Sequence, residues 1–172
     1  TSVGGDTLEI EVNSMPGKAD MILTGQMGDV MQESARIALT YVRSIVSKKP
    51  YNVDVEFFEN NCIHLHIPEG AVPKDGPSAG VTMATAILSA VARIPVKADI
   101  AMTGEINLRG KVLPIGGLKE KLLAAKSAGI KTVLVPIKNK SDVEEFDKEI
   151  TDGIQIEYMT DMKQVLENAL DI

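Results

Sequence analysis

The sequence predicts an α/β fold, a single compact domain of mixed strands and helices that extends over residues 1–172. Two observations predict it. Apolar residues recur at helical spacing in some segments and alternate as in strands in others, and the two kinds of segment follow one another along the chain. The chain is also 172 residues long and 44% hydrophobic, which is enough for one sizeable core. Because aromatic residues make up only 3%, aliphatic side chains and methionine have to build that core.

The N-terminal half is expected to contain strands and one long helix. The helix is predicted over residues 27–47, because apolar side chains such as Met31, Ala35, Ala38 and Val42 recur on one face. Strands are predicted where apolar and polar residues alternate, and loops lie between them. The predicted strands are residues 7–12, 20–24, 51–57 and 62–67, and the predicted loops are residues 13–18 and 48–50.

Helices and strands alternate again through the C-terminal half. The helix after Ser78 is apolar nearly all round, and such a helix is buried. An apolar strand at residues 131–135 is ended by Pro136. The other predicted elements are a strand at 99–103, a hairpin around 107–110 that leads toward Val112, a helix that opens after Gly117, a short helix at 141–146, a strand at 154–159 and a helix at 162–170.

A turn bracketed by glycines presents Ser78 at the start of the buried helix. Pro77 fixes one φ angle, and Gly76 and Gly80 let other backbone approach closely. The free N–H groups of a helix N-terminus can hold a developing oxyanion, so Ser78 is a candidate nucleophile. The alternative is a serine that caps the helix and has no chemical role.

Lys121 borders the apolar stripe that Leu118, Leu122 and Ala125 form on the next predicted helix. If this lysine is buried, its pKa falls and the amine becomes a usable base near neutral pH. If it reaches water instead, it is an ordinary lysine beside an apolar face. A serine needs a base before it can attack a carbonyl, so Ser78 and Lys121 together indicate a hydrolase of the Ser–Lys type.

The segment around residues 62–67 offers rival chemistries. On a strand, Cys62, His64 and His66 share one face, and these are ligands that zinc accepts. Ligands spaced along one strand converge poorly on a tetrahedral ion, so metal binding is disfavoured. A Ser-His-Asp triad that uses one of the histidines is a second rival. We favour the interpretation that these residues lie on a sheet face near the serine turn. His64 or His66 then contacts the substrate or the catalytic groups.

Composition narrows the range of partners. The net charge of −6 argues against nucleic acid as the main partner. The sequence has no apolar run of the roughly 20 residues that a transmembrane helix needs, so we expect no membrane span. It also contains no Gly-x-x-x-x-Gly-Lys-Ser/Thr loop, which predicts that this chain binds no ATP by that mechanism. Because the chain begins at Thr1 rather than methionine, we interpret it as a fragment or a processed product.

From residue 3 to residue 169 the chain resembles the proteolytic domain of Lon, the ATP-dependent serine protease. The resemblance is carried by the turn Pro-Lys-Asp-Gly-Pro-Ser-Ala-Gly at 73–80 and by Leu-Pro-Ile-Gly-Gly-Leu-Lys-Glu-Lys at 113–121. Shorter matching segments fall in the family's order at residues 3–5, 23–31, 64–70, 102–106 and 133–136. The form of the serine turn resembles the soluble A type of Lon rather than the membrane-anchored archaeal type.

The resemblance implies that Ser78 is the nucleophile and Lys121 the general base of a serine endopeptidase. It also implies that Thr103 lies near Lys121 and helps to orient it, although a threonine at a strand end also caps turns. Asp75 lies three residues before Ser78, and an ionised carboxylate within reach of Lys121 would keep that lysine protonated. Asp75 is therefore either a switch or a simple turn residue.

The resemblance further implies what the intact protein does. Full-length Lon carries an upstream ATPase module, which uses ATP and Mg²⁺, and a substrate-binding region. It degrades unfolded or damaged polypeptides as a homohexameric ring, in the bacterial cytoplasm or in the mitochondrial matrix. No cofactor is expected in this chain itself. Two readings outside proteolysis stay open, a phosphate-binding domain that uses the serine turn and a non-catalytic assembly domain.

Overall fold

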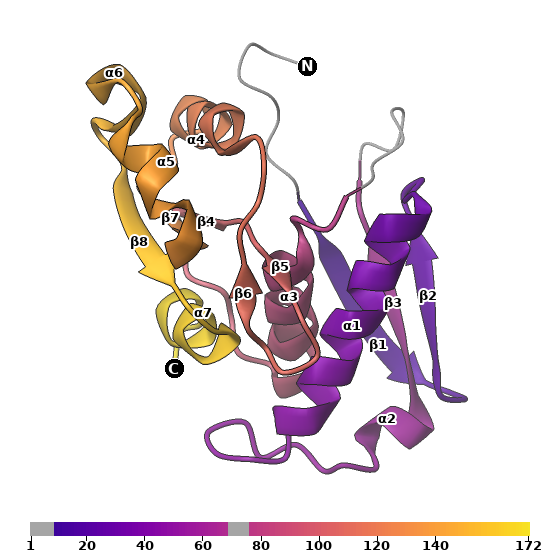
Figure 1. The fold of residues 1–172 in the computed structure, drawn as a ribbon. Helices are drawn as coiled ribbons and strands as arrows, with labels where there is room; N and C mark the ends of the chain where they lie inside the picture. The colour runs from indigo at the N-terminus through magenta and orange to yellow at the C-terminus, as the bar shows by residue number, and fades with distance from the viewer. Residues whose placement is uncertain (1–8, 69–75) are drawn as a thin grey trace.

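The computed structural model describes residues 9–68 and 76–172 (Figure 1). Within them, the strands form two three-stranded sheets and one short hairpin. The strands are β1 (Glu11–Pro16), β2 (Asp20–Thr24), β3 (Asn61–His66), β4 (Ile100–Met102), β5 (Glu105–Ile106), β6 (Val112–Leu113), β7 (Thr132–Pro136) and β8 (Gln155–Met159). The helices are α1 (Asp29–Ile45), α2 (Phe57–Asn60), α3 (Gly80–Ala92), α4 (Leu118–Ser127), α5 (Lys140–Glu144), α6 (Lys148–Thr151) and α7 (Met162–Ala169), with a 3₁₀ turn, η1, at Ile137–Asn139.

The first sheet has the order β1-β3-β2. Its central strand, β3, pairs antiparallel with β1 and parallel with β2. Ile63 and Leu65 of β3 are fully buried, whereas the alternate residues of that strand are only half-buried. Apolar residues on one side of α1, among them Ala35, Ala38 and Val42, are buried with them in the same cluster. The helical spacing of α1 and the alternation of β3 therefore produce one shared interface.

The second sheet has the order β4-β7-β8, and all of its strands run parallel. Its central strand, β7, is buried along most of its length, as strands of parallel sheets are. Leu134 of β7 belongs to the larger hydrophobic cluster, which contains α1, α3 and α7. Val133 and Val135 belong to a smaller cluster, which they share with α4. The strand therefore contributes side chains to two cores on its opposite faces.

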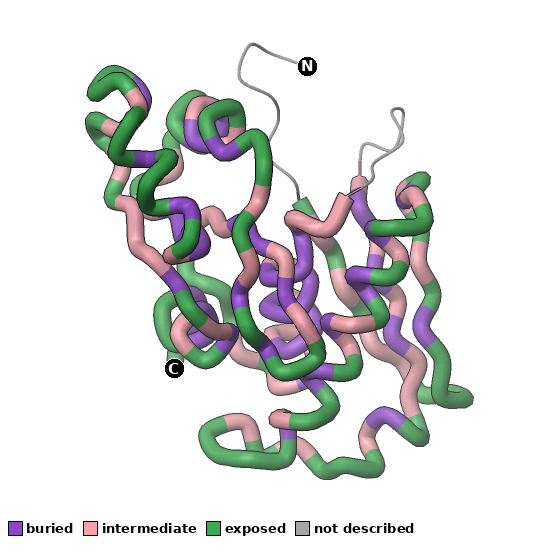
Figure 2. Tube along the Cα trace, in the orientation of Figure 1, coloured by how far each residue is buried: buried purple, intermediate pink, exposed green. Residues whose placement is uncertain are grey.

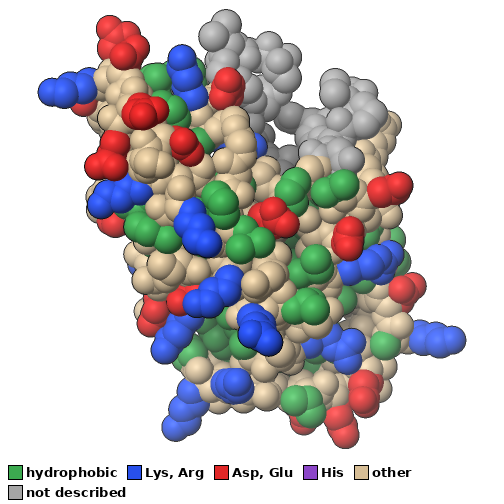
Figure 3. All heavy atoms as spheres, in the orientation of Figure 1, with side chains coloured by type: hydrophobic (Ala, Val, Ile, Leu, Met, Phe, Trp, Pro, Cys, Tyr) green, Lys and Arg blue, Asp and Glu red, His purple; other side chains and the backbone are tan. Residues whose placement is uncertain are grey.

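Helix α3 lies in the middle of the molecule (Figures 1 and 2) and is buried along nearly its whole length. Met83, Ile87 and Leu88 have no exposed surface. The sequence prediction of a buried helix after Ser78 is confirmed. Figure 3 shows one outer face of the domain, on which acidic and basic side chains are both spread among apolar ones. Among residues 9–68 and 76–172, no helix combines the length and the apolar character needed to cross a bilayer.

The structure confirms the predicted alternation of helices and strands, with two corrections. Residues 51–56 form no strand, and α2 begins at Phe57 where the strand was predicted to end. Asn52 has a φ of 53°, and a carboxylate oxygen of Asp54 accepts a hydrogen bond from the N–H of Glu56 at 2.8 Å. Asn and Asp stabilise turns through such local bonds, and here they outweigh the alternation of apolar residues.

The second correction concerns the loop that was predicted at residues 13–18. Strand β1 continues to Pro16, because its backbone pairs with β3 as far as Asn61. Tertiary pairing therefore overrides a run of residues that favour loops. The first part of the strand predicted at 7–12 lies outside the described residues. The sequence patterns also did not predict α2, α6 and η1, which are too short to show a periodicity.

Two glycines have the same φ angle but different surroundings, so the cost of backbone strain can be compared with the cost of a steric clash. Gly110 and Gly153 both have φ +83°, a conformation that L-residues rarely adopt. A Cβ added at Gly153 would meet nothing within 4 Å, whereas one added at Gly110 would collide with the Tyr41 ring. We expect Gly153→Ala to lower the free energy of unfolding by about 1–2 kcal/mol. Gly110→Ala should lower it by clearly more, because the buried tyrosine has to move.

Urea unfolding of both variants and the parent chain tests this expectation. Equal losses of stability for the two alanine variants would show that the Tyr41 contact does not constrain the hairpin.

Candidate active site

The serine turn is held against the segment that follows β4. The carbonyl oxygen of Ser78 accepts hydrogen bonds from the N–H of Gly104 at 2.8 Å and from the Thr103 hydroxyl at 3.3 Å. In return, the carbonyl of Gly104 accepts from the N–H of Val81 at 3.1 Å. We refer to these three bonds as the serine clasp. They hold the carbonyl of Ser78 and the first turn of α3 against the segment after β4. The half-buried side chain of Ser78 lies just before α3 begins.

The clasp requires close approach of two backbones. A Cβ added at Gly80 would lie 3.2 Å from the nitrogen of Ile106 and 3.4 Å from the carbonyl oxygen of Gly104. The glycine after the serine is therefore used for contact between α3 and β5, as its place in the sequence indicated. Gly76 has a φ of 115°, which only glycine adopts without strain, and it turns the chain into Pro77 and Ser78.

Lys121 lies one turn into α4, and its helix is held by the smaller core. Leu118 and Leu122 are buried in that core, so Lys121 comes to lie half-buried at its edge. Burial lowers the pKa of the Lys121 amine below its ordinary 10.5, and the nearby Glu120 carboxylate opposes this shift only in part. The deprotonated amine is the form that can accept a proton.

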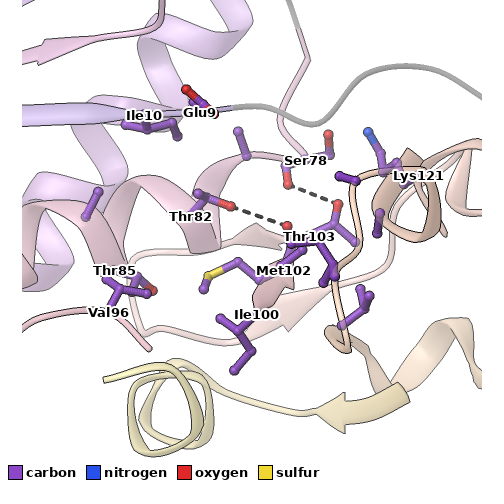
Figure 4. A pocket seen from close by; sticks show the side chains of 17 residues that line it. Glu9, Ile10, Ser78, Thr82, Thr85, Val96, Ile100, Met102, Thr103 and Lys121 are labelled. Carbon is purple, nitrogen blue, oxygen red and sulfur yellow. Dashed lines mark hydrogen bonds between the residues drawn. The ribbon is translucent and has the colours of Figure 1, made fainter. Parts of the chain in front are cut away.

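Ser78 and Lys121 line the same pocket, which has a volume of about 510 Å³. Figure 4 shows their side chains directed toward the same end of it. Thr103 and Thr82 line it as well, and its walls are largely apolar. The apolar lining comes from Ile10, Ala79, Ala86, Val96, Ile100, Ala101, Met102, Ala125, Ala128, Ile130 and Val133. The structure thus brings together two side chains that are 43 positions apart in the sequence (121 − 78).

Thr103 was predicted to orient Lys121. In the structure it is buried and lines the pocket that contains Lys121. Its hydroxyl donates to the carbonyl of Ser78, and its N–H donates to the carbonyl of Leu134 in β7 at 3.1 Å. The contacts found for Thr103 therefore lead to the serine and to the central strand of the second sheet. A direct role toward the lysine stays a prediction.

His64 and His66 lie on β3 and contact Thr24 of the neighbouring strand. The Thr24 hydroxyl is 2.9 Å from Nε2 of His64 and 2.6 Å from Nδ1 of His66. Neither histidine is among the described residues that line the pocket of Ser78. A Ser-His-Asp triad therefore receives no support from the described contacts, and a role of either histidine toward substrate stays a prediction.

The metal alternative also receives no support. Within residues 9–68 and 76–172, no group of three or more His, Cys, Asp or Glu side chains is arranged to hold a metal ion. Cys62 is a free thiol on the same strand as the two histidines. Asp75 lies outside the described residues, so its proposed effect on Lys121 stays open.

Thr82 is a pocket residue that the sequence patterns did not single out. It lies in the first turn of α3, four positions after Ser78, and its hydroxyl is 3.4 Å from the carbonyl oxygen of Met102. That i+4 spacing was a usable signal. Glu9, which also lines the pocket and is exposed, gave no signal in the sequence.

A serine held at a helix start and a desolvated lysine in one pocket define the class of site, a candidate hydrolase site of the Ser–Lys type. The family follows from comparison with known proteins. A family model described as the Lon protease (S16) C-terminal proteolytic domain matches residues 1–172. The chain belongs to this family, and it is a protease domain.

Relatives that carry the name Lon protease support the assignment. The chain is 62% identical over 170 residues to the one from Lachnoclostridium phytofermentans and 54% identical over 170 residues to the one from Clostridioides difficile. It is 56% identical over 171 residues to the one from Vibrio parahaemolyticus. Each comparison covers 99% of this chain but only 21–22% of the relative, so the chain spans about a fifth of their length.

The desolvated amine makes a prediction about stability. A lowered pKa means that the folded state releases the Lys121 proton at a lower pH than the unfolded state does. The free energy of unfolding should therefore rise as pH increases from the folded pKa of Lys121 toward its ordinary 10.5. Lys121→Met should lack this rise and should be more stable than the parent near neutral pH, because it removes an ammonium that burial disfavours.

Urea unfolding at several pH values measures both effects. Lys119→Met is the matched control, since Lys119 is exposed and its loss should change stability little. Parallel stability–pH curves for the parent and Lys121→Met would contradict the burial of the amine.

Proposed function

We propose that this domain is a serine endopeptidase in which Ser78 is the nucleophile and Lys121 the general base. One observation carries the proposal. Ser78 and Lys121 line a single pocket, and burial makes the lysine amine easier to deprotonate. The membership of the chain in a family of proteolytic domains supports the same reaction.

The reaction proceeds through an acyl-enzyme. The neutral amine of Lys121 accepts the hydroxyl proton as Oγ of Ser78 attacks the scissile carbonyl, which gives a tetrahedral intermediate. The Lys121 ammonium then donates that proton to the leaving amine, and the peptide bond breaks. A water molecule attacks the resulting ester with Lys121 again acting as base. The second product leaves with a new carboxylate, and Ser78 recovers its hydroxyl proton.

Backbone amides at the serine turn are the proposed oxyanion donors. The N–H of Gly80 donates to the carbonyl of Pro77 at 3.2 Å, and the N–H of Val81 donates within the serine clasp. Both are already engaged, so we assign the oxyanion to the amides of Ser78 and Ala79. The positive end of the α3 dipole stabilises negative charge at the same place.

The serine clasp gives Thr103 a supporting role in this mechanism. A nucleophile on a free turn would sample several orientations, and only some of them would face the amine. Two hydrogen bonds to the carbonyl of Ser78 restrict that freedom before substrate binds. The arrangement thus provides part of the orientation that a bimolecular reaction would otherwise lack.

We further propose that the intact protein is an ATP-dependent protease, as the resemblance to Lon implies. Its substrates would be unfolded or damaged polypeptides, and it would work as a homohexamer, in the bacterial cytoplasm or in a mitochondrial matrix. The ATPase that uses ATP and Mg²⁺ would lie in the part of the protein that this chain does not include. Two facts support this division of labour: the chain contains no Gly-x-x-x-x-Gly-Lys-Ser/Thr loop, and it corresponds to about a fifth of each relative.

Ser78→Ala tests the nucleophile. The variant should fold like the parent, because the serine clasp uses the backbone of Ser78, and it should lose all peptide cleavage. A fluorophosphonate should label the parent at Ser78 and leave the variant unlabelled. Cleavage by the folded variant at the parental rate would refute the assignment. A folded parent that is neither labelled at Ser78 nor able to cleave peptides would instead favour the phosphate-binding or assembly hypotheses.

Lys121→Arg tests the base. A guanidinium keeps the charge but stays protonated, so this variant should be inactive, whereas Lys119→Arg should be nearly as active as the parent. The parental rate should rise with pH as the Lys121 amine deprotonates, with a midpoint below 10.5, since burial lowers its pKa. A pH–rate profile of the three proteins on one unstructured peptide measures this. Normal cleavage by Lys121→Arg with an inactive Lys119→Arg would show that the wrong lysine was assigned. Normal cleavage by both variants would rule out the Ser–Lys mechanism and favour His64 or His66 as the base.

A further inference from the structure

The loop at residues 114–117, between β6 and α4, determines where the lysine helix begins. It contains two consecutive glycines, and a Cβ added at Gly116 would meet nothing within 4 Å. Gly117 has a φ of 70°, in the left-handed region, just before the first residue of α4. Such a loop has many accessible conformations, so a contact from elsewhere has to fix its path.

Asn139 makes that contact. Its Oδ1 accepts from the N–H of Ile115 at 3.0 Å, and its Nδ2 donates to the carbonyl of Ile115 at 2.9 Å. Nδ2 also donates to a carboxylate oxygen of Asp142 at 2.8 Å. The Asn139 side chain is only 2% exposed. The carboxamide therefore bonds both the backbone N–H and the backbone carbonyl of Ile115, as a neighbouring strand would. Because the amide is buried, water competes little for these bonds.

Asn139 is itself connected to the serine. It is the last residue of η1, which directly follows β7. The carbonyl of Leu134 in β7 accepts from the N–H of Thr103, and the hydroxyl of Thr103 donates to the carbonyl of Ser78. A continuous path of backbone and buried polar contacts thus leads from the loop before α4 to the serine clasp.

We propose that Asn139 is a positioning residue for the peptidase reaction: its amide fixes the loop before α4 and so holds Lys121 in place relative to Ser78. The inference rests on the proposed roles of Ser78 and Lys121. Because Lys121 lies only one turn into α4, a shift of the loop moves the amine with the helix. A misplacement of about 1 Å in a catalytic group lowers rates by roughly a hundredfold.

Two substitutions remove the contact in different ways. Asn139→Ala removes every bond of the carboxamide. Asn139→Asp keeps the shape and can still accept from the N–H of Ile115, but it loses both donated bonds and places a second carboxylate beside Asp142. For both variants we expect kcat on an unstructured peptide to fall by roughly tenfold to a hundredfold, with little change in KM.

The pH–rate profile separates positioning from simple loss of stability. A loosened α4 exposes the Lys121 amine to water, so the midpoint of the profile should move up toward the ordinary 10.5. A variant that is only less stable would lose active molecules and keep the parental midpoint. Fluorophosphonate labelling of Ser78 should slow in parallel with kcat.

Asn107→Ala is the matched control. Asn107 accepts hydrogen bonds from the backbone N–H groups of Arg109 and Lys111, each at 3.0 Å, in the hairpin between β5 and β6. The Asn107 side chain thus also stabilises a loop through hydrogen bonds to its backbone, but that loop is not the one before α4. We expect it to lower stability while the pH midpoint and KM stay at the parental values.

The outcomes are distinct. If both Asn139 variants are folded and keep the parental kcat and pH midpoint, the inference is wrong. If neither folds, Asp142→Ala decides the question: a raised midpoint with reduced kcat supports the inference, and a parental profile overturns it. If the parent chain itself shows no cleavage that depends on Ser78 and Lys121, then the proposed function fails, and the inference fails with it.

Discussion

The arrangement of the site depends on strand β7, because its side chains pack into two hydrophobic cores on opposite faces. Its Leu134 packs into the larger core, and Val133 and Val135 pack into the smaller one. Helix α3, which follows Ser78, belongs to the first core, and α4, which carries Lys121, belongs to the second. A pocket that needs Ser78, next to α3, and Lys121, on α4, therefore requires that both cores form on the same strand. The alternation of side chains along an extended backbone provides this without any covalent link.

The backbone contacts at the serine turn show how a domain with few aromatic residues achieves close packing. A Cβ at Gly80 would lie 3.2 Å from the peptide nitrogen of Ile106, which is closer than an ordinary contact, so the glycine lets α3 approach β5. A Cβ at Gly104 would lie 3.0 Å from methyl groups of Val81 and Val112. The backbone at these points is thus surrounded by other chain segments, and the hydrogen bonds of the serine clasp are partly shielded from water. Shielded bonds are stronger, which suits a turn that has to keep one orientation.

Much of this arrangement could be predicted from the sequence. The position of Ser78 at the start of a buried helix follows from a glycine-bracketed turn before an apolar run. The position of Lys121 at the edge of a core follows from the stripe formed by Leu118, Leu122 and Ala125. These signals are local, and the residues that carry them are adjacent or one helical turn apart. That the two groups meet in one pocket is not a local signal; it was inferred from the need of a serine for a base and from resemblance to a family.

The contacts that could not be predicted join distant parts of the chain. Asn139 lies in a polar segment that reads as a surface loop, yet its side chain is buried against a residue 24 positions earlier. The continuation of β1 to Pro16 depends on β3, which lies far along the sequence. Residues 51–56 alternate like a strand, but local bonds of Asp54 and the backbone angle of Asn52 produce a turn. Each of these outcomes is decided by a partner that a local pattern does not contain.

The unequal size of the two cores affects the order in which parts of the domain unfold on warming. The core beneath α4 contains far fewer buried side chains than the core around α3, so its local opening requires less free energy. On warming, the amides of α4, α5 and α6 should exchange their hydrogens before those of α3. A molecule in that partly opened state keeps its nucleophile folded but has lost the base. Inactivation would then precede global unfolding and would be reversed when the smaller core closes again.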